Sequence, residues 1–122
     1  MTFDELCAAS GLQSAQLEEL VSYGLLQGRP VGGSVFFDAS AVAVARVAGA
    51  FARFGVEARH LRLHKHAAER EAGFIEQIVL PLVKQRNPEA RRRAVETAAE
   101  LARLGQALRG ELVQRSLRDL LG

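Results

Sequence analysis

The sequence predicts a mainly α-helical fold with one small β-hairpin and long C-terminal helices. Apolar residues recur at helical spacing over most of its 122 residues, and turn-forming residues cluster between positions 28 and 33. The composition, 48% apolar and 25% charged, is that of a globular protein, and the length suits one moderate core. We therefore expect a single domain, 1–122, in which residues 1–65 form a compact part and residues 57–122 supply long helices for packing.

Two short helices are predicted at the start of the chain. Thr2 and Glu5 have the spacing of a capping box, and Ser10-Gly11 supplies a turn after the first helix. Ser14 is expected to cap the second helix, and Gly24 to end it in a left-handed conformation. Two helices joined by a tight turn predict a helix-turn-helix.

Glycines and a proline separate two short extended pieces, Arg29–Val31 and Val35–Phe37, which predict a β-hairpin where a wing would lie. Asp38 is expected to cap a third helix, and Gly55 to end it. The apolar residues that recur along this helix are Val44, Val47, Ala48 and Phe51.

A fourth helix is predicted from about Glu57 to Arg86, and Pro81 is expected to bend or end it. Asn87 can cap, and Pro88 can start, a last helix of about 30 residues. Because so long a helix cannot bury its apolar stripe alone, we expect it to pack on the fourth helix and on a second copy of the chain, as a homodimer. The stripe residues expected in this packing include Leu101, Leu104, Leu108, Leu112 and Leu117.

The charge is distributed unevenly along the chain. Residues 1–28 contain four acids and no Lys or Arg, a formal charge of −4, whereas the remainder carries +6. Because a helix that enters a DNA groove needs cations near the phosphates, the second helix is not expected to bind DNA. Arg91, Arg92 and Arg93 form either a solvated face or a contact for an anionic partner.

Several functional classes are not expected. No segment approaches the roughly 18 apolar residues of a membrane span, and Met1 precedes a helix start rather than a leader, so we expect a cytoplasmic protein. Cys7 is the single cysteine, which excludes an internal disulfide, and it is expected to be buried. His60 and His64 share a helix face without a third ligand, so no metal or cofactor is expected. The sequence shows no nucleophilic side chain paired with a general base, so an enzyme is not expected.

A set of short motifs resembles the winged helix-turn-helix of MerR-family transcription regulators over residues 2–65. Besides the glycine-rich wing, the motifs are Gly11-Leu12, Leu17, Gly24-Leu25-Leu26, Phe36-Phe37-Asp38 and Arg53-Phe54-Gly55-Val56-Glu57. In that family, arginines typically stand at the positions of Ala15 and Glu18, a tyrosine at that of Leu20, and a wing arginine near Val35. The resemblance implies a recognition unit that retains its structural positions and lacks its contacts to DNA.

The second half extends the resemblance. The runs 54–62, 81–84 and 116–121 are similar to the C-terminal domain of actinobacterial cell-division regulators of the MerR family (FtsR type). In such regulators an N-terminal domain binds promoter DNA, and a degenerate second copy of the fold is thought to dimerise or to sense an effector. The resemblance implies a homodimer that reaches DNA through a separate N-terminal domain and has an effector or protein partner.

Three hypotheses for function follow. The leading one is a regulatory and dimerisation domain that does not itself read DNA. The alternative is a DNA-binding winged-helix protein that uses the basic residues of its later helices. The third is an effector or peptide receptor, with a groove between wing and fourth helix, although the wing aromatics could instead fill the core. The groove residues expected are Tyr23, Phe36, Phe37, His60 and His64.

Overall fold

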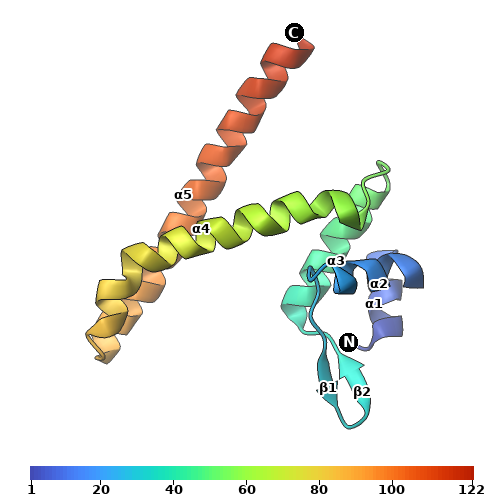
Figure 1. Ribbon diagram of the computed structural model, residues 1–122, viewed down its shortest axis with the longest axis horizontal. Helices are drawn as coiled ribbons and strands as arrows, with labels where there is room; N and C mark the ends of the chain where they lie inside the picture. Colours follow the sequence, from blue (N-terminus) through green and yellow to red (C-terminus); the bar gives the residue numbers. More distant parts are fainter. The chain divides into compact units, whose positions relative to one another are not determined.

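The computed structural model describes all residues from 1 to 122 as five helices and a two-stranded antiparallel sheet (Figure 1). The fold class predicted from the sequence is confirmed. The elements are α1 (Phe3–Ser10), α2 (Ser14–Ser22), β1 (Arg29–Val31), β2 (Ser34–Phe36), α3 (Ala39–Ala52), α4 (Ala58–Lys84) and α5 (Pro88–Leu121). The chain divides into two compact units, Met1–His66 and Ala67–Gly122, and the division falls next to the predicted boundary at residue 65. A single folding domain stays a prediction.

The local signals at the start of the chain form as predicted. The Glu5 backbone N–H donates to Thr2 Oγ1 (3.3 Å), and the Thr2 N–H donates to Glu5 Oε1 (3.1 Å), which completes the capping box of α1. Gly11 ends α1 with a φ of 75°, and Gly24 follows α2 with a φ of 78°. Both conformations suit glycine because it lacks a Cβ. Cys7 is half-buried rather than buried.

The start of α2 differs from the prediction. The helix begins at Ser14, so Gln13 is the capping residue, and its backbone N–H donates to Gln16 Oε1 at 2.9 Å. A glutamine three residues into the helix can reach back to the cap as a glutamate does. Ser14 therefore lies one residue inside the helix that it was expected to cap.

The wing is built from β1 and β2, with Pro30 opposite Val35 and Arg29 opposite Phe36. The second strand ends at Phe36, one residue earlier than predicted. The backbone of Phe37 pairs instead with the first residue: its N–H donates to the Met1 carbonyl (2.7 Å), and the Met1 ammonium donates to the Phe37 carbonyl (2.9 Å). Figure 1 shows the N-terminus beside the hairpin. This pairing holds the Phe37 side chain in the core.

Small residues form the buried face of α3; of the apolar residues that recur along it, Ala48 is buried, while Val44 and Phe51 are partly buried against the core. Ala45 is fully buried, whereas Val47 is 58% exposed. The reason is the close approach of α1: a Cβ on Gly49 would lie 2.2 Å from the Ser10 carbonyl oxygen. Only a helix face without bulk permits such a distance. The buried core of this unit is Leu6, Leu12, Leu17, Leu20, Leu26, Phe37, Ala41, Ala45, Ala48, Ala58 and Leu61.

The second unit contains the later part of α4 and all of α5. Helix α4 continues through Pro81 to Lys84. Pro81 lies three residues before the helix end, and the carbonyl that loses its donor belongs to Gln77, which is exposed, so water can reach it. Arg86 turns the chain with a φ of 54°. The Asn87 side chain then accepts from the Ala90 N–H (2.8 Å), which confirms the predicted cap of α5.

The core of this second unit is small. Its buried residues are Val79, Ala90 and Ala94. Farther along the helices, Arg109 Nη1 donates to Glu71 Oε2 at 2.8 Å. Every residue from 110 to 122 is exposed, so the last three turns of α5 have no cover within their own unit.

Candidate regulatory surfaces

Helix α2 presents an acidic surface at the position of a recognition helix. Leu17 and Leu20 are buried, which leaves Ala15, Glu18 and Glu19 exposed. No residue of α2 is a cation. Two carboxylates on this face would repel a phosphate backbone, so its chemistry is opposite to that of a DNA-reading helix.

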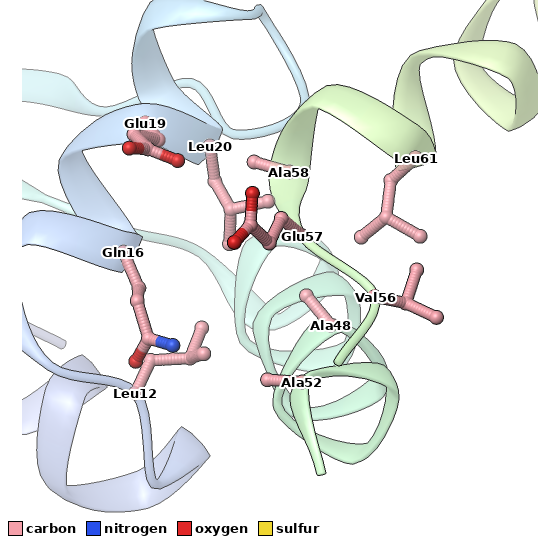
Figure 2. A pocket seen from close by; sticks show the side chains of 10 residues that line it. All are labelled: Leu12, Gln16, Glu19, Leu20, Ala48, Ala52, Val56, Glu57, Ala58 and Leu61. Carbon is pink, nitrogen blue, oxygen red and sulfur yellow. The ribbon is translucent and has the colours of Figure 1, made fainter. Parts of the chain in front are cut away.

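A cleft of about 140 Å³ lies beside α2 in the first unit (Figure 2). Gln16 and Glu19 of α2 and Glu57 before α4 supply its polar side chains. Its apolar lining is Leu12, Leu20, Ala48, Ala52, Val56, Ala58 and Leu61. The volume suits one side chain or a few water molecules better than a drug-sized ligand.

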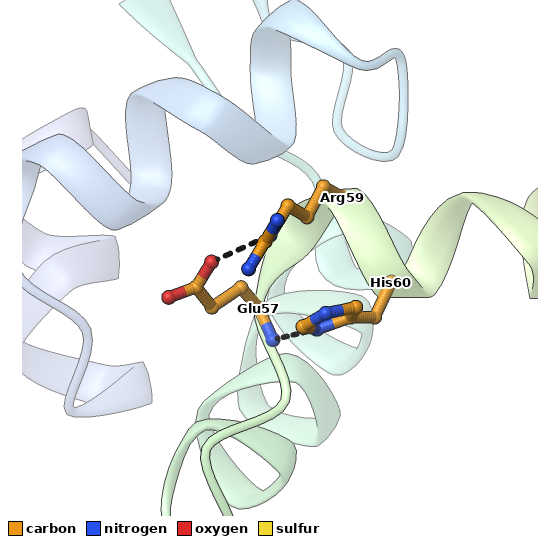
Figure 3. A network of polar contacts seen from close by, with 3 residues as sticks. All are labelled: Glu57, Arg59 and His60. Atoms are coloured by element: carbon orange, nitrogen blue, oxygen red, sulfur yellow. Dashed lines mark hydrogen bonds and ion pairs between the residues drawn. The ribbon is translucent and has the colours of Figure 1, made fainter.

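A polar network stands where α4 begins (Figure 3). The Glu57 backbone N–H donates to His60 Nδ1 at 2.9 Å, and Arg59 Nε donates to Glu57 Oε2, also at 2.9 Å. His60 therefore acts as a local cap of the helix and needs an unprotonated Nδ1 to do so. The Arg59 and Glu57 side chains are 65% and 58% exposed, so their ion pair adds little stability.

An apolar groove of about 410 Å³ separates α3 from the start of α4. His64 is its polar member, and the His64 ring centroid lies 5.8 Å from that of Phe51 in a tilted arrangement. The other lining residues are Leu25, Ala43, Val44, Val47, Ala48 and Leu61. Val44 and Val47, two of the apolar residues that recur along α3, thus line a surface groove.

Of the five residues predicted for an effector groove, only His64 lines this one. Phe37 is buried in the core, and Phe36 is 38% exposed on the wing. The Tyr23 ring lies 5.1 Å from the Arg62 guanidinium carbon, a cation–π contact. His60 caps α4. The predicted set is dispersed because the other four side chains have different surroundings: the core, the surface of the wing, the Arg62 guanidinium and the start of α4.

The leucine stripe of α5 is largely uncovered. Leu101 is half-buried, whereas Leu104, Leu108, Leu112 and Leu117 are 49%, 62%, 41% and 40% exposed. Leu108 and Leu112 follow Leu101 by seven and eleven residues, close to two and three helical turns, so they continue the face that is buried earlier in α5.

Arg91, Arg92 and Arg93 are all exposed near the start of α5. No ion pair involves any of the three, in contrast to Arg103, which pairs with Glu100 in the same helix. No three His, Cys, Asp or Glu side chains converge as they would at a metal site. No helix combines the length and apolarity that crossing a bilayer requires.

These surfaces belong to a recognised domain type, because the family model described as the Rv1828-like C-terminal domain matches residues 1–121. The chain belongs to this family. Two similar curated proteins are the uncharacterized HTH-type transcriptional regulators Rv1828 of Mycobacterium tuberculosis and Mb1859 of Mycobacterium bovis. Each is 38% identical over 118 residues, 97% of this chain. The resemblance to an actinobacterial regulator's C-terminal domain is thereby confirmed.

This Rv1828-like domain spans about half the length of the curated relatives, since the aligned residues are 47% of each.

The sequence was sufficient to identify the leucine stripe and the arginine run. It missed the groove between α3 and α4, because the groove depends on which face of α3 the close contact with α1 leaves free. Glycine at position 49, amid small residues, was the available signal.

Proposed function

We propose that this domain is the regulatory and dimerisation domain of a MerR-type transcription regulator and that it does not itself read DNA. The observation that carries the proposal is the uncovered stripe of α5. Leu108 and Leu112 lie on the face that buries Ala90 and Ala94 earlier in the helix, yet nothing in the second unit covers them. An apolar face that continues a packing face favours a partner with the same chemistry.

The acidic face of α2 supports the second half of the proposal. Glu18 and Glu19 occupy the exposed side of the helix that would enter the groove. The relatives are named HTH-type transcriptional regulators and are about twice as long, which leaves room in them for a separate DNA-reading segment.

Pairing of two copies would act through geometry. A two-fold dimer holds two linked DNA-binding heads at a fixed separation, which suits an operator with two half-sites. The second head then binds at a high effective concentration. Any ligand or protein that alters the pairing changes the affinity of the whole regulator for DNA.

The test is the mass of the chain in solution, by light scattering over a concentration series. We expect a dimer for the unchanged protein and a monomer for Leu108→Asp. Val95→Asp is the matched control, because Val95 lies outside the stripe on the same helix and has the same exposure of 62% as Leu108. If the unchanged chain were still monomeric at about 100 μM, its dimer would be too weak to support the proposal, which would be overturned. Equal effects of the two variants would also overturn it.

A second candidate function, effector sensing, is favoured by the groove between α3 and α4. Its volume of about 410 Å³ falls in the range of small-molecule sites, and its lining favours an apolar ligand. The fluorescent probe anilinonaphthalene sulfonate is expected to bind the protein and raise its melting temperature. Ala43→Trp, which fills the groove, should abolish this shift, and Ala8→Trp, at an exposed position of α1, should not. An unchanged shift in Ala43→Trp would exclude the groove as the ligand site.

A further inference from the structure

We propose that the turn between α4 and α5 contacts the phosphate backbone of duplex DNA. The surface consists of five cations, here called the basic tip: Lys84, Arg86, Arg91, Arg92 and Arg93. The inference rests on the proposed function to the extent that a regulator brings this domain close to DNA. It goes beyond that function because it gives the domain a contact with DNA of its own.

The positive charge of the second unit is concentrated at the basic tip. Residues 84–93 hold five of the ten Lys and Arg residues in Ala67–Gly122, but only one of its eight acids, Glu89. The rest of the unit has five cations and seven acids. The excess of cations therefore comes entirely from one turn.

The cations of the basic tip have no partners within the second unit. All five are exposed, and none takes part in an ion pair. Elsewhere in the same unit, Arg103 pairs with Glu100 and Arg109 pairs with Glu71. Cations left without acids remain available to an anionic ligand.

Folding alone does not explain this placement. Arg91, Arg92 and Arg93 stand in the early turns of α5, where the helix dipole and their mutual repulsion disfavour positive charge. Arg86 has a φ of 54°, a conformation that glycine or asparagine adopts at lower cost. Residue choices that reduce the stability of a segment indicate a function outside it.

The residue types favour a phosphate backbone over other anions. Four of the five cations are arginines, whose planar fork matches phosphate oxygens. Residues 84–93 contain no aromatic residue and no exposed large apolar residue. They therefore lack the anchors of a protein interface, the rings that stack unpaired bases and the apolar side chains that enter a membrane. What remains is recognition of backbone charge without sequence reading.

The geometry favours an extended array of charges over one small anion. Successive helical residues differ by about 100°, so Arg91, Arg92 and Arg93 span about 200°, a little more than half, of the α5 circumference. Lys84 and Arg86 add charge from the other side of the turn. Neighbouring phosphates on a duplex could engage several of these groups together, which a single phosphate ion could not.

The experiment measures binding of the chain to a labelled mixed-sequence duplex of about 30 base pairs by fluorescence anisotropy, at salt concentrations from about 20 to 200 mM. The test variant is Arg91→Gln/Arg92→Gln/Arg93→Gln. The matched control, Arg46→Gln/Arg53→Gln/Arg115→Gln, removes the same charge from three exposed arginines outside the tip. Circular dichroism checks that both variants fold.

We expect the test variant to bind the duplex at least about tenfold more weakly at low salt, and the slope of log K against log[salt] to become shallower by about 2 to 3. The control should stay within about threefold of the unchanged chain, as should a variant with lysine at positions 91, 92 and 93, because backbone contact requires charge. Equal losses in the test and control variants would overturn the proposal. So would binding to phosphatidylserine vesicles or to polyglutamate as tight as binding to the duplex.

The two proposals fail separately. Neutralising the arginines should leave the mass measured by light scattering unchanged, because Leu108 and Leu112 lie farther along α5. A chain that dimerises but ignores the duplex contradicts only the basic tip. A monomer that binds the duplex through these arginines contradicts only the dimerisation proposal.

Discussion

Gly49 provides the sharpest test of how the first unit packs. In most helix interiors, replacing glycine by alanine favours folding by about 1 kcal/mol. At Gly49 the new Cβ would lie 2.2 Å from the Ser10 carbonyl oxygen and 3.3 Å from the Ser10 carbonyl carbon. We expect Gly49→Ala to destabilise the protein.

The magnitude follows from that distance. Ordinary contact begins near 3.4 Å, so α1 and α3 would have to separate by more than 1 Å. The obstacle is backbone at the end of α1, held by the bond from the Gly11 N–H to the Cys7 carbonyl (3.0 Å), so it cannot rotate away as a side chain could. Overpacking costs about 1–3 kcal/mol, and because the obstacle here is backbone we expect a cost near the upper end, about 3 kcal/mol. After the propensity gain of about 1 kcal/mol, the net loss is about 2 kcal/mol.

Urea unfolding followed by helical circular dichroism measures the loss as a lower midpoint at an unchanged slope. Gly73→Ala is the control, because the Cβ of that variant, in α4, meets nothing within 4 Å. Since only the propensity term acts there, Gly73→Ala should gain about 1 kcal/mol. If Gly49→Ala were as stable as the unchanged chain or more stable, the close approach of α1 to α3 would be refuted.

Three further predictions concern turns and caps. Arg86→Gly should raise the free energy of unfolding by about 1 kcal/mol, because glycine adopts the φ of 54° without steric cost; an unchanged urea midpoint would contradict this. Asp38→Ala should lower it by about 1 kcal/mol, because Asp38 Oδ1 accepts the Ala41 N–H at 2.9 Å, whereas Asp38→Asn should preserve most of it. The N–H and hydroxyl of Thr2 hold the pKa of Glu5 below its ordinary value of 4.5. At a pH between the two pKa values the unfolded chain therefore binds more protons than the folded chain. The stability that the ionised Glu5 contributes is lost as the pH falls through the lowered pKa. Carboxyl NMR titration should show that pKa rising in Thr2→Ala.

The sequence was sufficient to predict those features that depend on neighbours along the chain. Thr2 with Glu5, Asp38, and Asn87 with Pro88 each place a cap within four residues of the group it satisfies, so spacing alone identifies the helix start. Such signals placed six of the seven elements within about two residues, a precision usual for caps and turns.

The errors arose where distant segments meet. Ala45 and Val47 are both apolar residues of α3, and the sequence does not say which of them faces the core. The approach of α1 to Gly49 decides that the alanine is buried and the valine is exposed. Sequence could not bring the predicted effector residues to one groove for the same reason: whether His60 caps a helix or lines a groove depends on its rotamer at the start of α4. Pro81 was ambiguous because its effect depends on its distance from the helix end.

The bare end of α5 also has a dynamic consequence. Residues 110–122 include Gly110 and gain no burial, so their helix persists only by extending the packed turns before it. In the monomeric Leu108→Asp variant, amide hydrogens there should exchange with solvent through local fraying, at a free energy far below that of global unfolding, while those near Ala94 should be protected. Exchange rates along this single helix would therefore report, residue by residue, how much of it is covered at any moment.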